Sequence, residues 1–396
     1  MAIKKVKAAL IGCGMISWTY FNNLIRNFQI VDLVGCSDLI EERSRARAQE
    51  FGVKQMTNEE IFNDPEIQIV VNTTYPTSHY EIIEQSLKSG KHVYTEKMMA
   101  CNWDEAQRLA TLAKEKNLRI GCAPDTMLSG PAQTARKLVD DGYIGEVIAV
   151  QALLVRGMRD WLPRNTNGET WGKGGAIPMD MGAYYMHQMI NMLGPVARVS
   201  GFSITRDWQM YNTMLPNYGS ALKSVQPTSV TGALEFKNGV IGNMTILGEG
   251  FVETPRLEVY GTDGILTCAD PNTFSGPVYL TRNGSNKKMP IPSTHDYNNY
   301  ETGEPHESFI NPWRGGPDRF RECRRGLGVA DMAWAITNNR PHRCSLEIGL
   351  HSMEILHGID DSCATNRVYT MTTDVERPAP LPAGFYGLEA EKALDN

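Results

Sequence analysis

The sequence lacks the features of a membrane or nucleic-acid-binding protein. No apolar run in its 396 residues approaches the length of a membrane span, and no long block of lysine and arginine offers a footprint for nucleic acid or anionic lipid. Lys4, Lys5 and Lys7 precede an apolar stretch, but Gly12 and Gly14 interrupt it before a secretory signal is complete. We therefore expect a cytoplasmic protein with a small-molecule partner, and neither nucleic acid nor membrane.

The eight cysteines also lack the spacing of a metal or disulfide framework. They are scattered without a CxxC pair, so we expect reduced, mostly buried thiols and no metal site. Hydrophobic residues at 41% and charged residues at 21% are typical of globular proteins. The chain length exceeds what one hydrophobic core usually organises, so two domains are expected.

The first 125 residues alternate short apolar runs with amphipathic segments, which is typical of a parallel sheet wrapped by helices. Apolar residues recur at three- and four-residue spacing over 81–88 and 103–116, so these segments are expected to be helices. The runs themselves predict strands over 8–11, 30–36, 67–71, 92–94 and 119–122.

After about residue 125 the pattern changes to helices mixed with longer strands. Helices are expected over 131–141, 182–193 and 345–359, an irregular excursion over 270–316, and an extended tail from 377. Strands are expected over 147–155, 196–205, 228–236, 240–247 and 257–260. The fold class is therefore α/β: a doubly wound parallel sheet over 1–125, an α/β domain with a large mixed, mostly antiparallel open sheet over 126–376, and a tail over 377–396.

The segment GCGMIS at 12–17 follows the first apolar strand directly and opens a helix, which is the context of a dinucleotide-binding fingerprint. Gly12 permits the tight turn, and Gly14 lets the backbone approach a pyrophosphate at the helix N-terminus. Ser17 takes the place of a third glycine, and an ordinary tight turn is the alternative interpretation. The segment predicts a Rossmann domain whose cofactor contacts here are Gly12, Gly14, Met15 and Ile16.

Asp38 ends the second expected strand, where a carboxylate accepts hydrogen bonds from the adenosine ribose hydroxyls. The same charge repels a 2′-phosphate, and Leu39 and Ile40 supply no cation to offset it. Asp38 therefore predicts NAD in preference to NADP, with a solvated loop acid as the alternative interpretation.

Residues 90–100 read GKHVYTEKMMA and resemble the glucose-fructose oxidoreductase and inositol dehydrogenase family (Gfo/Idh/MocA), whose members carry a GKHV…EKP segment at this point. The resemblance covers nearly the whole chain. It implies that Lys97 reaches both the nicotinamide ribose and the substrate hydroxyl, with Glu96 beside it in the cofactor site. Met98 replaces the usual proline.

Residues 74–79, TYPTSH, resemble the loop of that family that lies along the cofactor. The resemblance makes Thr74, Tyr75, Pro76 and His79 cofactor-site candidates. We interpret His79 as a structural histidine that tethers the loop rather than as a catalytic group.

Residues 174–187, GGAIPMDMGAYYMH, resemble the glycine-rich turn of the family, in which an Asp is followed four residues later by a catalytic His or Tyr. This chain has the Tyr variant. Helical spacing places Asp180, Tyr184 and His187 on one face and turns Tyr185 away. A capped helix with a packed tyrosine is the alternative interpretation.

Oxidation of a secondary alcohol needs a hydride acceptor and a base for the hydroxyl proton. We expect the Lys97 ammonium to bring the pKa of Tyr184 toward neutrality and to donate to the developing alkoxide. Asp180 would orient the pair or bind a substrate hydroxyl. His187 is a competing base, and it is equally suited to bind a neighbouring hydroxyl.

Further substrate contacts are expected from segments on either side of the glycine-rich turn. Asp125 departs from the more basic segment of many family members and is a candidate acceptor for substrate hydroxyls. Trp161, Trp171 and Lys173 predict a lid, because aromatic faces stack on the C–H faces of sugars. Core packing explains either tryptophan equally well.

Together these features predict an NAD-dependent oxidoreductase that holds NAD tightly and oxidises a secondary ring hydroxyl of a sugar, polyol or glycoside, with C3 of a glucoside suggested by analogy. The sequence does not identify the sugar. The alternatives are a reductase of a non-sugar substrate, such as an imine or unsaturated ring, and an inactive NAD-binding regulator. The resemblance also implies a homo-oligomer, either a dimer or a tetramer.

Overall fold

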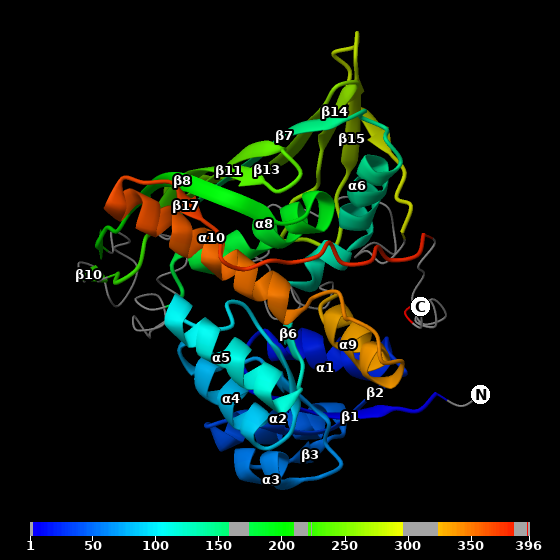
Figure 1. Cartoon of the computed structure of the whole chain (residues 1–396). Coiled ribbons are helices and arrows are strands. Elements are labelled where there is room, and N and C mark those ends of the chain that lie inside the picture. The colour runs from blue at the N-terminus through cyan, green and yellow to red at the C-terminus, as the bar shows by residue number, and fades with distance from the viewer. Residues whose placement is uncertain are drawn as a thin grey trace.

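The computed structural model describes residues 3–157, 174–209, 221–222, 224–295, 324–383 and 394 (Figure 1). Within this part of the chain, two large sheets lie one above the other, with helices between and around them. None of the described helices is long and apolar enough to cross a membrane. The seven cysteines of the described residues are free thiols.

The N-terminal sheet has six parallel strands in the order β3-β2-β1-β4-β5-β6, as in a Rossmann fold. Helices cover both faces, so the central strands are almost wholly apolar. The predicted doubly wound sheet is confirmed. Its strands are β1 (Val6–Ile11), β2 (Val31–Ser37), β3 (Lys54–Gln55), β4 (Ile69–Asn72), β5 (His92–Thr95) and β6 (Ile120–Cys122).

Capping side chains, a left-handed residue and a proline mark ends of the helices in this half. The Asn102 side chain caps α5 by accepting from the Glu105 amide, and Asn117 ends the helix in a left-handed conformation. Both ends of α5 were predicted, whereas α4 begins five residues before the expected 81, with Pro76 in its first turn. The helices are α1 (Ser17–Arg26), α2 (Glu41–Phe51), α3 (Asn58–Asn63), α4 (Pro76–Lys88) and α5 (Trp103–Lys116).

The second sheet has nine strands in the order β16-β15-β14-β13-β7-β12-β11-β8-β17. All its pairs are antiparallel except β12 with β7, so the predicted mixed, mostly antiparallel sheet is confirmed. The strands are β7 (Val147–Gly157), β8 (Val196–Ile204), β11 (Ser229–Phe236), β12 (Ile241–Leu247), β13 (Glu249–Gly261), β14 (Gly264–Thr267), β15 (Val278–Arg282), β16 (Met289–Ile291) and β17 (Tyr369–Thr370), while β9 (Trp208–Gln209) pairs separately with β10 (Ala221–Leu222).

The irregular excursion expected over 270–316 is wrong where β15 and β16 lie. Val278 and Leu280 alternate with more exposed residues and bury their side chains, so a short strand pattern was present within a segment rich in turn residues. Residues 296–316 of that prediction lie outside the described residues.

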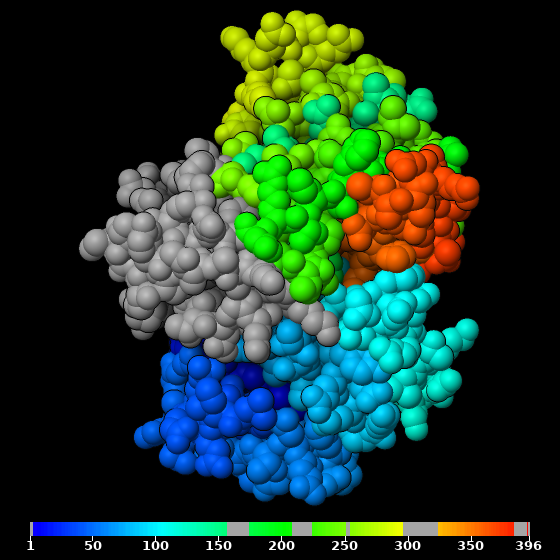
Figure 2. All heavy atoms as spheres, turned by 90° about the vertical axis from the view of Figure 1, so that its left-hand side faces the viewer, coloured from blue at the N-terminus to red at the C-terminus, as the bar shows by residue number. Residues whose placement is uncertain are grey.

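One face of the nine-stranded sheet is covered by α8 and α10 (Figure 1). Every residue of α8 except Asp180 is buried, and the helix begins five residues before the predicted 182. In the space-filling view α10 also rests against α5 of the N-terminal half (Figure 2). The helices of this part are η1 (Asp125–Leu128), α6 (Gly130–Asp140), α8 (Ile177–Leu193), α9 (Leu327–Thr337) and α10 (Leu346–Thr365).

The chain returns to the N-terminal sheet late in the sequence. The Cys122 amide of β6 donates to the Cys344 carbonyl at 2.9 Å, Gly121 and Ser345 form an antiparallel bridge, and α9 packs against β6. The domain bounds remain predictions, and the structure adds that residues 324–345 border the Rossmann sheet.

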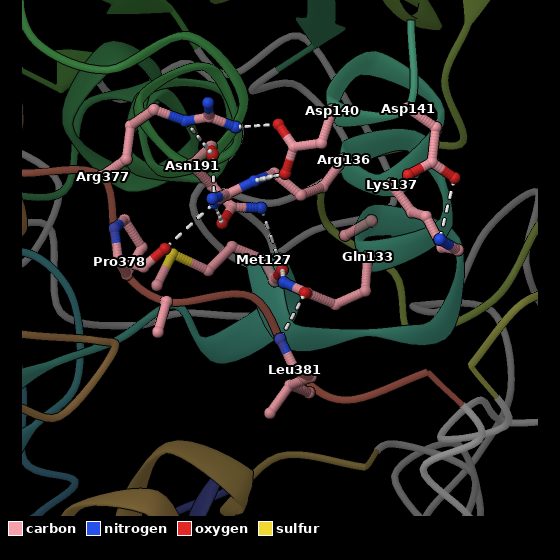
Figure 3. A network of polar contacts seen from close by, with 12 residues as sticks. Met127, Gln133, Arg136, Lys137, Asp140, Asp141, Asn191, Arg377, Pro378 and Leu381 are labelled. Atoms are coloured by element: carbon pink, nitrogen blue, oxygen red, sulfur yellow. Dashed lines mark hydrogen bonds and ion pairs between the residues drawn. The ribbon is translucent and has the colours of Figure 1, made fainter. Parts of the chain in front are cut away.

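The extended tail is held along α6 and α8 by a buried arginine (Figure 3). The Arg136 guanidinium donates to the Asp140 carboxylate, to the carbonyl and side chain of Asn191, and to the Pro378 carbonyl. Arg377 pairs with the second oxygen of Asp140 at 2.5 Å. These bonds fix the start of the tail against the second half of the molecule.

Candidate active site

The turn between β1 and α1 is closely packed at Gly12 and open at Gly14. Gly12 has φ +100°, and a Cβ atom there would lie 2.7 Å from the backbone of Thr73 and Thr74. Only glycine fits this close approach of two loops. A Cβ atom at Gly14 would meet nothing within 4 Å, so the outer side of the turn is open.

The N-terminus of α1 has no side-chain cap. Ile16 occupies the cap position in a helical conformation without a capping hydrogen bond, and the first turn carries no acidic residue. The Ser17 hydroxyl donates to the Gly14 carbonyl at 2.6 Å and does not cap the helix. The backbone N–H groups at a helix start suit an anion such as a pyrophosphate, so the turn fits a dinucleotide.

Asp38 lies beside this turn at the end of β2. Its Oδ2 atom accepts from the Cys13 amide at 2.6 Å and its Oδ1 atom from the Ile40 amide at 2.8 Å. The carboxylate is partly exposed, and each oxygen keeps a further lone pair for a hydroxyl donor. Leu39 is 92% exposed and brings no positive charge.

His79 joins the β4–α4 loop to the segment after β5. Its Nδ1 atom lies 2.6 Å from the Met98 carbonyl and its Nε2 atom 3.1 Å from the Thr74 carbonyl. The ring is buried, and burial lowers its pKa despite both carbonyls. Tyr75 in the same loop is 47% exposed, and Pro76 starts α4.

Lys97 and Asp180 bring the two halves together. Lys97 follows β5, Asp180 lies in the first turn of α8, and their Nζ and Oδ1 atoms are 2.5 Å apart. Burial by itself lowers the pKa of Lys97, but Asp180, Tyr184 and Glu96 together outweigh burial and the pKa is raised. Lys97 is therefore an ammonium group at neutral pH.

Tyr184 lies one turn further along α8, and its surroundings correct one prediction. The Lys97 ammonium faces the ring, 5.4 Å from its centroid, and its charge is matched by Asp180. Burial raises the pKa of Tyr184, whereas Arg325 and Lys97 lower it. Lys97 lowers the pKa of Tyr184 as expected, but the expected net shift toward neutrality is wrong, because burial, Glu96 and Asp180 together outweigh the two cations.

His187 points toward the segment before η1. Its Nδ1 atom lies 3.2 Å from the Pro124 carbonyl, and burial lowers the pKa of His187 to about 4. The imidazole is neutral at pH 7, which suits a hydrogen-bonding group better than a proton acceptor of near-neutral pKa.

Asp125 is fully buried at the start of η1. Its Oδ2 atom accepts from the amides of Gly326 and Gly328 at 2.8 and 3.1 Å, so the carboxylate holds the first turn of α9. Burial raises the pKa of Asp125 against these two bonds and the charge of Arg325. Its part in substrate binding stays a prediction.

Arg325 belongs to the site and was missed by the sequence analysis. Its Nη2 atom donates to the Tyr184 hydroxyl at 2.6 Å. Glu96 is buried nearby, accepts from the Tyr20 hydroxyl at 2.7 Å, and has a lowered pKa because Arg325 and Lys97 outweigh its burial. The only sequence signal for Arg325 was a basic residue directly before the apolar helix 327–337.

Trp161, Trp171 and Lys173, predicted to form a lid, lie outside the described residues. Their contribution to a substrate site stays a prediction.

Comparison with known proteins matches both halves to one family. The NAD-binding Rossmann-fold model of the GFO/IDH/MocA oxidoreductase family matches residues 6–123, and the C-terminal domain model of that family matches residues 132–267. An uncharacterized oxidoreductase of Schizosaccharomyces pombe is 30% identical over 193 residues, covering 48% of this chain and 52% of the relative. The chain spans about half the length of such curated relatives.

Two other proteins are similar over most of the chain. A 1,5-anhydro-D-fructose reductase of Ensifer adhaerens is 25% identical over 339 residues, covering 82% of this chain and 95% of the relative. The structure of a levoglucosan dehydrogenase with NADH and levoglucosan superimposes with a TM-score of 0.74 at 16% identity, covering 93% of this chain and all of the other. This likeness between structures shows a shared fold.

Proposed function

Because the chain belongs to the GFO/IDH/MocA oxidoreductase family, we propose that it transfers hydride between NAD and a secondary ring carbon of a sugar, polyol or glycoside. The observation that carries the proposal is the partly buried Lys97–Asp180 ion pair beside Tyr184, where the segment after β5 of one half meets α8 of the other. An inactive NAD-binding regulator has no use for such a pair.

NAD would supply the hydride acceptor, held by the open turn at Gly14, the uncapped start of α1 and the Asp38 carboxylate. Asp38 favours NAD over NADP by its charge. We further propose that NAD is held tightly enough to purify with the protein.

The chain's own residues have distinct tasks. Lys97 stays protonated and donates to the substrate oxygen, which stabilises negative charge as it develops there. Asp180 orients that ammonium. Tyr184 exchanges a proton with the same oxygen. Because the pKa of Tyr184 is raised, the neutral phenol is ready to protonate a carbonyl, whereas alcohol oxidation requires the phenolate and is favoured by alkaline pH.

The names of relatives support a carbohydrate substrate. They include the reductase of 1,5-anhydro-D-fructose, an inositol 2-dehydrogenase of Lactiplantibacillus plantarum and the levoglucosan dehydrogenase. All act on polyhydroxylated rings by name. Within this class we propose C3 of a glucoside as the position oxidised, with His187 and Asp125 on the substrate side.

The test is a screen in both directions with Lys97→Met as the matched control. Sugars, polyols and glycosides are offered with NAD, and keto sugars with NADH, while cofactor absorbance is followed. We expect one class of ring alcohol to reduce NAD, with turnover lowered by about 10²-fold or more in Lys97→Met because charge stabilisation is lost. NAD binding without turnover in either direction would contradict the proposal and favour a regulator.

A further inference from the structure

The side chain of Arg325 closes over the hydroxyl end of Tyr184. Arg325 is 6% exposed and Tyr184 3%, so the pair is shielded from solvent. The guanidinium carbon lies 5.3 Å from the ring centroid, while Nη2 donates to the phenol oxygen at 2.6 Å. A hydrogen bond from a cation to a buried oxygen is among the stronger polar contacts in proteins.

Four charged groups influence Tyr184, and they differ in how they reach it. From the segment after β5 come Glu96 and Lys97, from α8 itself comes Asp180, and from the segment before α9 comes Arg325. Lys97 lies over the ring and is paired with Asp180. Of these two cations, Arg325 is the one hydrogen-bonded to the phenol oxygen, where the charge of a phenolate is carried.

Arg325 is held by residues from three other segments of the chain, two of which contact the backbone beside it and one its side chain. Asn23 of α1 donates to the Arg325 carbonyl at 2.7 Å, and Asp125 of η1 accepts from the amides of Gly326 and Gly328. Asn272 accepts from Nη2 at 3.3 Å. The guanidinium is therefore pre-oriented, and a fixed donor needs little reorganisation when charge appears beside it.

We propose that Arg325 is a positioning residue that stabilises the ionised form of Tyr184 during the hydride transfer proposed above, on which this inference rests. Arginine has no acceptor, so its bond uses a lone pair of the phenol oxygen and leaves the phenolic proton for the substrate. When a carbonyl carbon gains hydride, the O–H bond of Tyr184 breaks, the O–H bond of the alcohol forms, and the negative charge left on the phenolate faces the guanidinium. Alcohol oxidation reverses these steps.

The first arm of the test needs no substrate. The full chain is prepared with 3,5-difluorotyrosine at position 184, whose fluorines lower the phenol pKa into a range where proteins remain folded, and its ionisation is followed by fluorine NMR. In Arg325→Met we expect the midpoint to rise by about one pH unit, a tenfold weaker ionisation. Arg325→Lys should restore part of the shift, and Arg136→Met, which removes a buried guanidinium elsewhere, should leave the midpoint unchanged.

The second arm follows single-turnover hydride transfer against pH. The alkaline rise of alcohol oxidation should move to higher pH in Arg325→Met by the same amount, and Arg325→Met should cause no further shift in a Tyr184→Phe background. An unchanged fluorotyrosine midpoint in Arg325→Met would overturn the inference. If that variant does not fold, Arg325→Gln takes its place, and an unchanged midpoint in Arg325→Gln overturns the inference. A shifted midpoint in a protein that oxidises no ring alcohol leaves the Arg325 inference standing and refutes the proposed function alone.

Discussion

The two sheets of the molecule place their functional residues by different means. In the N-terminal sheet every strand runs parallel, so the turns after β1, β2 and β4 gather at one edge. Gly12 and Asp38 follow their strands directly, and Thr74 is the second residue after β4. In the second half Tyr184 is placed by α8, but its partner Arg325 arrives from far along the chain. The candidate cofactor contacts are therefore placed by the strands that precede them. The contact between Tyr184 and Arg325 depends on segments far apart in the sequence.

The largest expected effect is the loss of turnover when Tyr184 of α8 is changed. If turnover were not lost, α8 would not carry the chemical side of the site. Tyr184→Phe removes the proton-exchanging hydroxyl and keeps the ring, so turnover should fall by about 10² to 10⁴-fold with NAD affinity unchanged. Tyr185→Phe, the buried neighbour, is the matched control and should keep its turnover.

His187, on the same helix, is the alternative candidate for the catalytic base. His187→Ala should raise KM and leave single-turnover transfer near normal, because its pKa of about 4 makes it a weak base. Near-normal transfer in Tyr184→Phe, together with loss of the basic limb of the pH profile in His187→Ala, would show that the histidine is the base.

The next largest expected effect is on the stability of the second half, through Arg136. Arg136→Met removes the buried guanidinium that donates to Asp140, to Asn191 and to the Pro378 carbonyl, so the free energy of unfolding should fall by about 2–4 kcal/mol. Lys137→Met, next along α6 and bonded to the exposed Asp141, is the control and should leave the denaturation midpoint unchanged (Figure 3). Equal midpoints in the two variants would mean that the tail is not held by Arg136.

Acid should act on both halves through the buried His187 and the partly buried His92. Burial lowers the pKa of His187 and of His92 from 6.5 to about 4. The unfolded chain takes up these protons first, so the stability each neutral ring provides is complete above pH 6.5 and is lost as the pH falls toward 4, by up to roughly 3 kcal/mol for His187. Urea midpoints from pH 8 to 4 should show this slope, and His187→Gln and His92→Gln should each flatten it. A slope unchanged in both variants would place the proton uptake elsewhere.

The smallest expected effect is on cofactor affinity, through Asp38 at the end of β2. Asp38→Ala should weaken NAD by about 1 kcal/mol and strengthen NADP, because one carboxylate both accepts from the ribose and repels a 2′-phosphate. Calorimetric titration of both cofactors measures this, and Asp32→Ala in the same strand should change neither affinity. If the unaltered protein prefers NADP, Asp38 does not face the ribose.

The sequence predicts best what adjacent residues decide. The turn at Gly12, the strand ending before Asp38 and both ends of α5 follow from turn, capping and periodicity rules, and the structure agrees with each. The common face of Asp180 and Tyr184 follows from helical spacing in the same way, and Lys97 contacts both.

What the sequence could not give depends on packing between distant segments. The raised pKa of Tyr184 could not be predicted, because it depends on burial, which no local pattern reports, together with the charges of Glu96 and Asp180. Arg325 has no motif of its own, since its position is set by Asn23 and Asp125 from the other end of the chain. β15 was hidden because turn residues surround a strand of five residues.

The late return of the chain to β6 has a consequence for biosynthesis. The Ile120 carbonyl accepts from His342, which lies 222 residues later in the chain. The Cys122 amide donates to the Cys344 carbonyl across the same separation. On the ribosome, the nascent Rossmann sheet therefore exposes an unpaired edge strand while most of the second half is still being translated. Unpaired edges recruit strands from other chains, and contacts of such separation form slowly. The growing polypeptide is thus most prone to aggregate in the interval between synthesis of β6 and synthesis of residue 345.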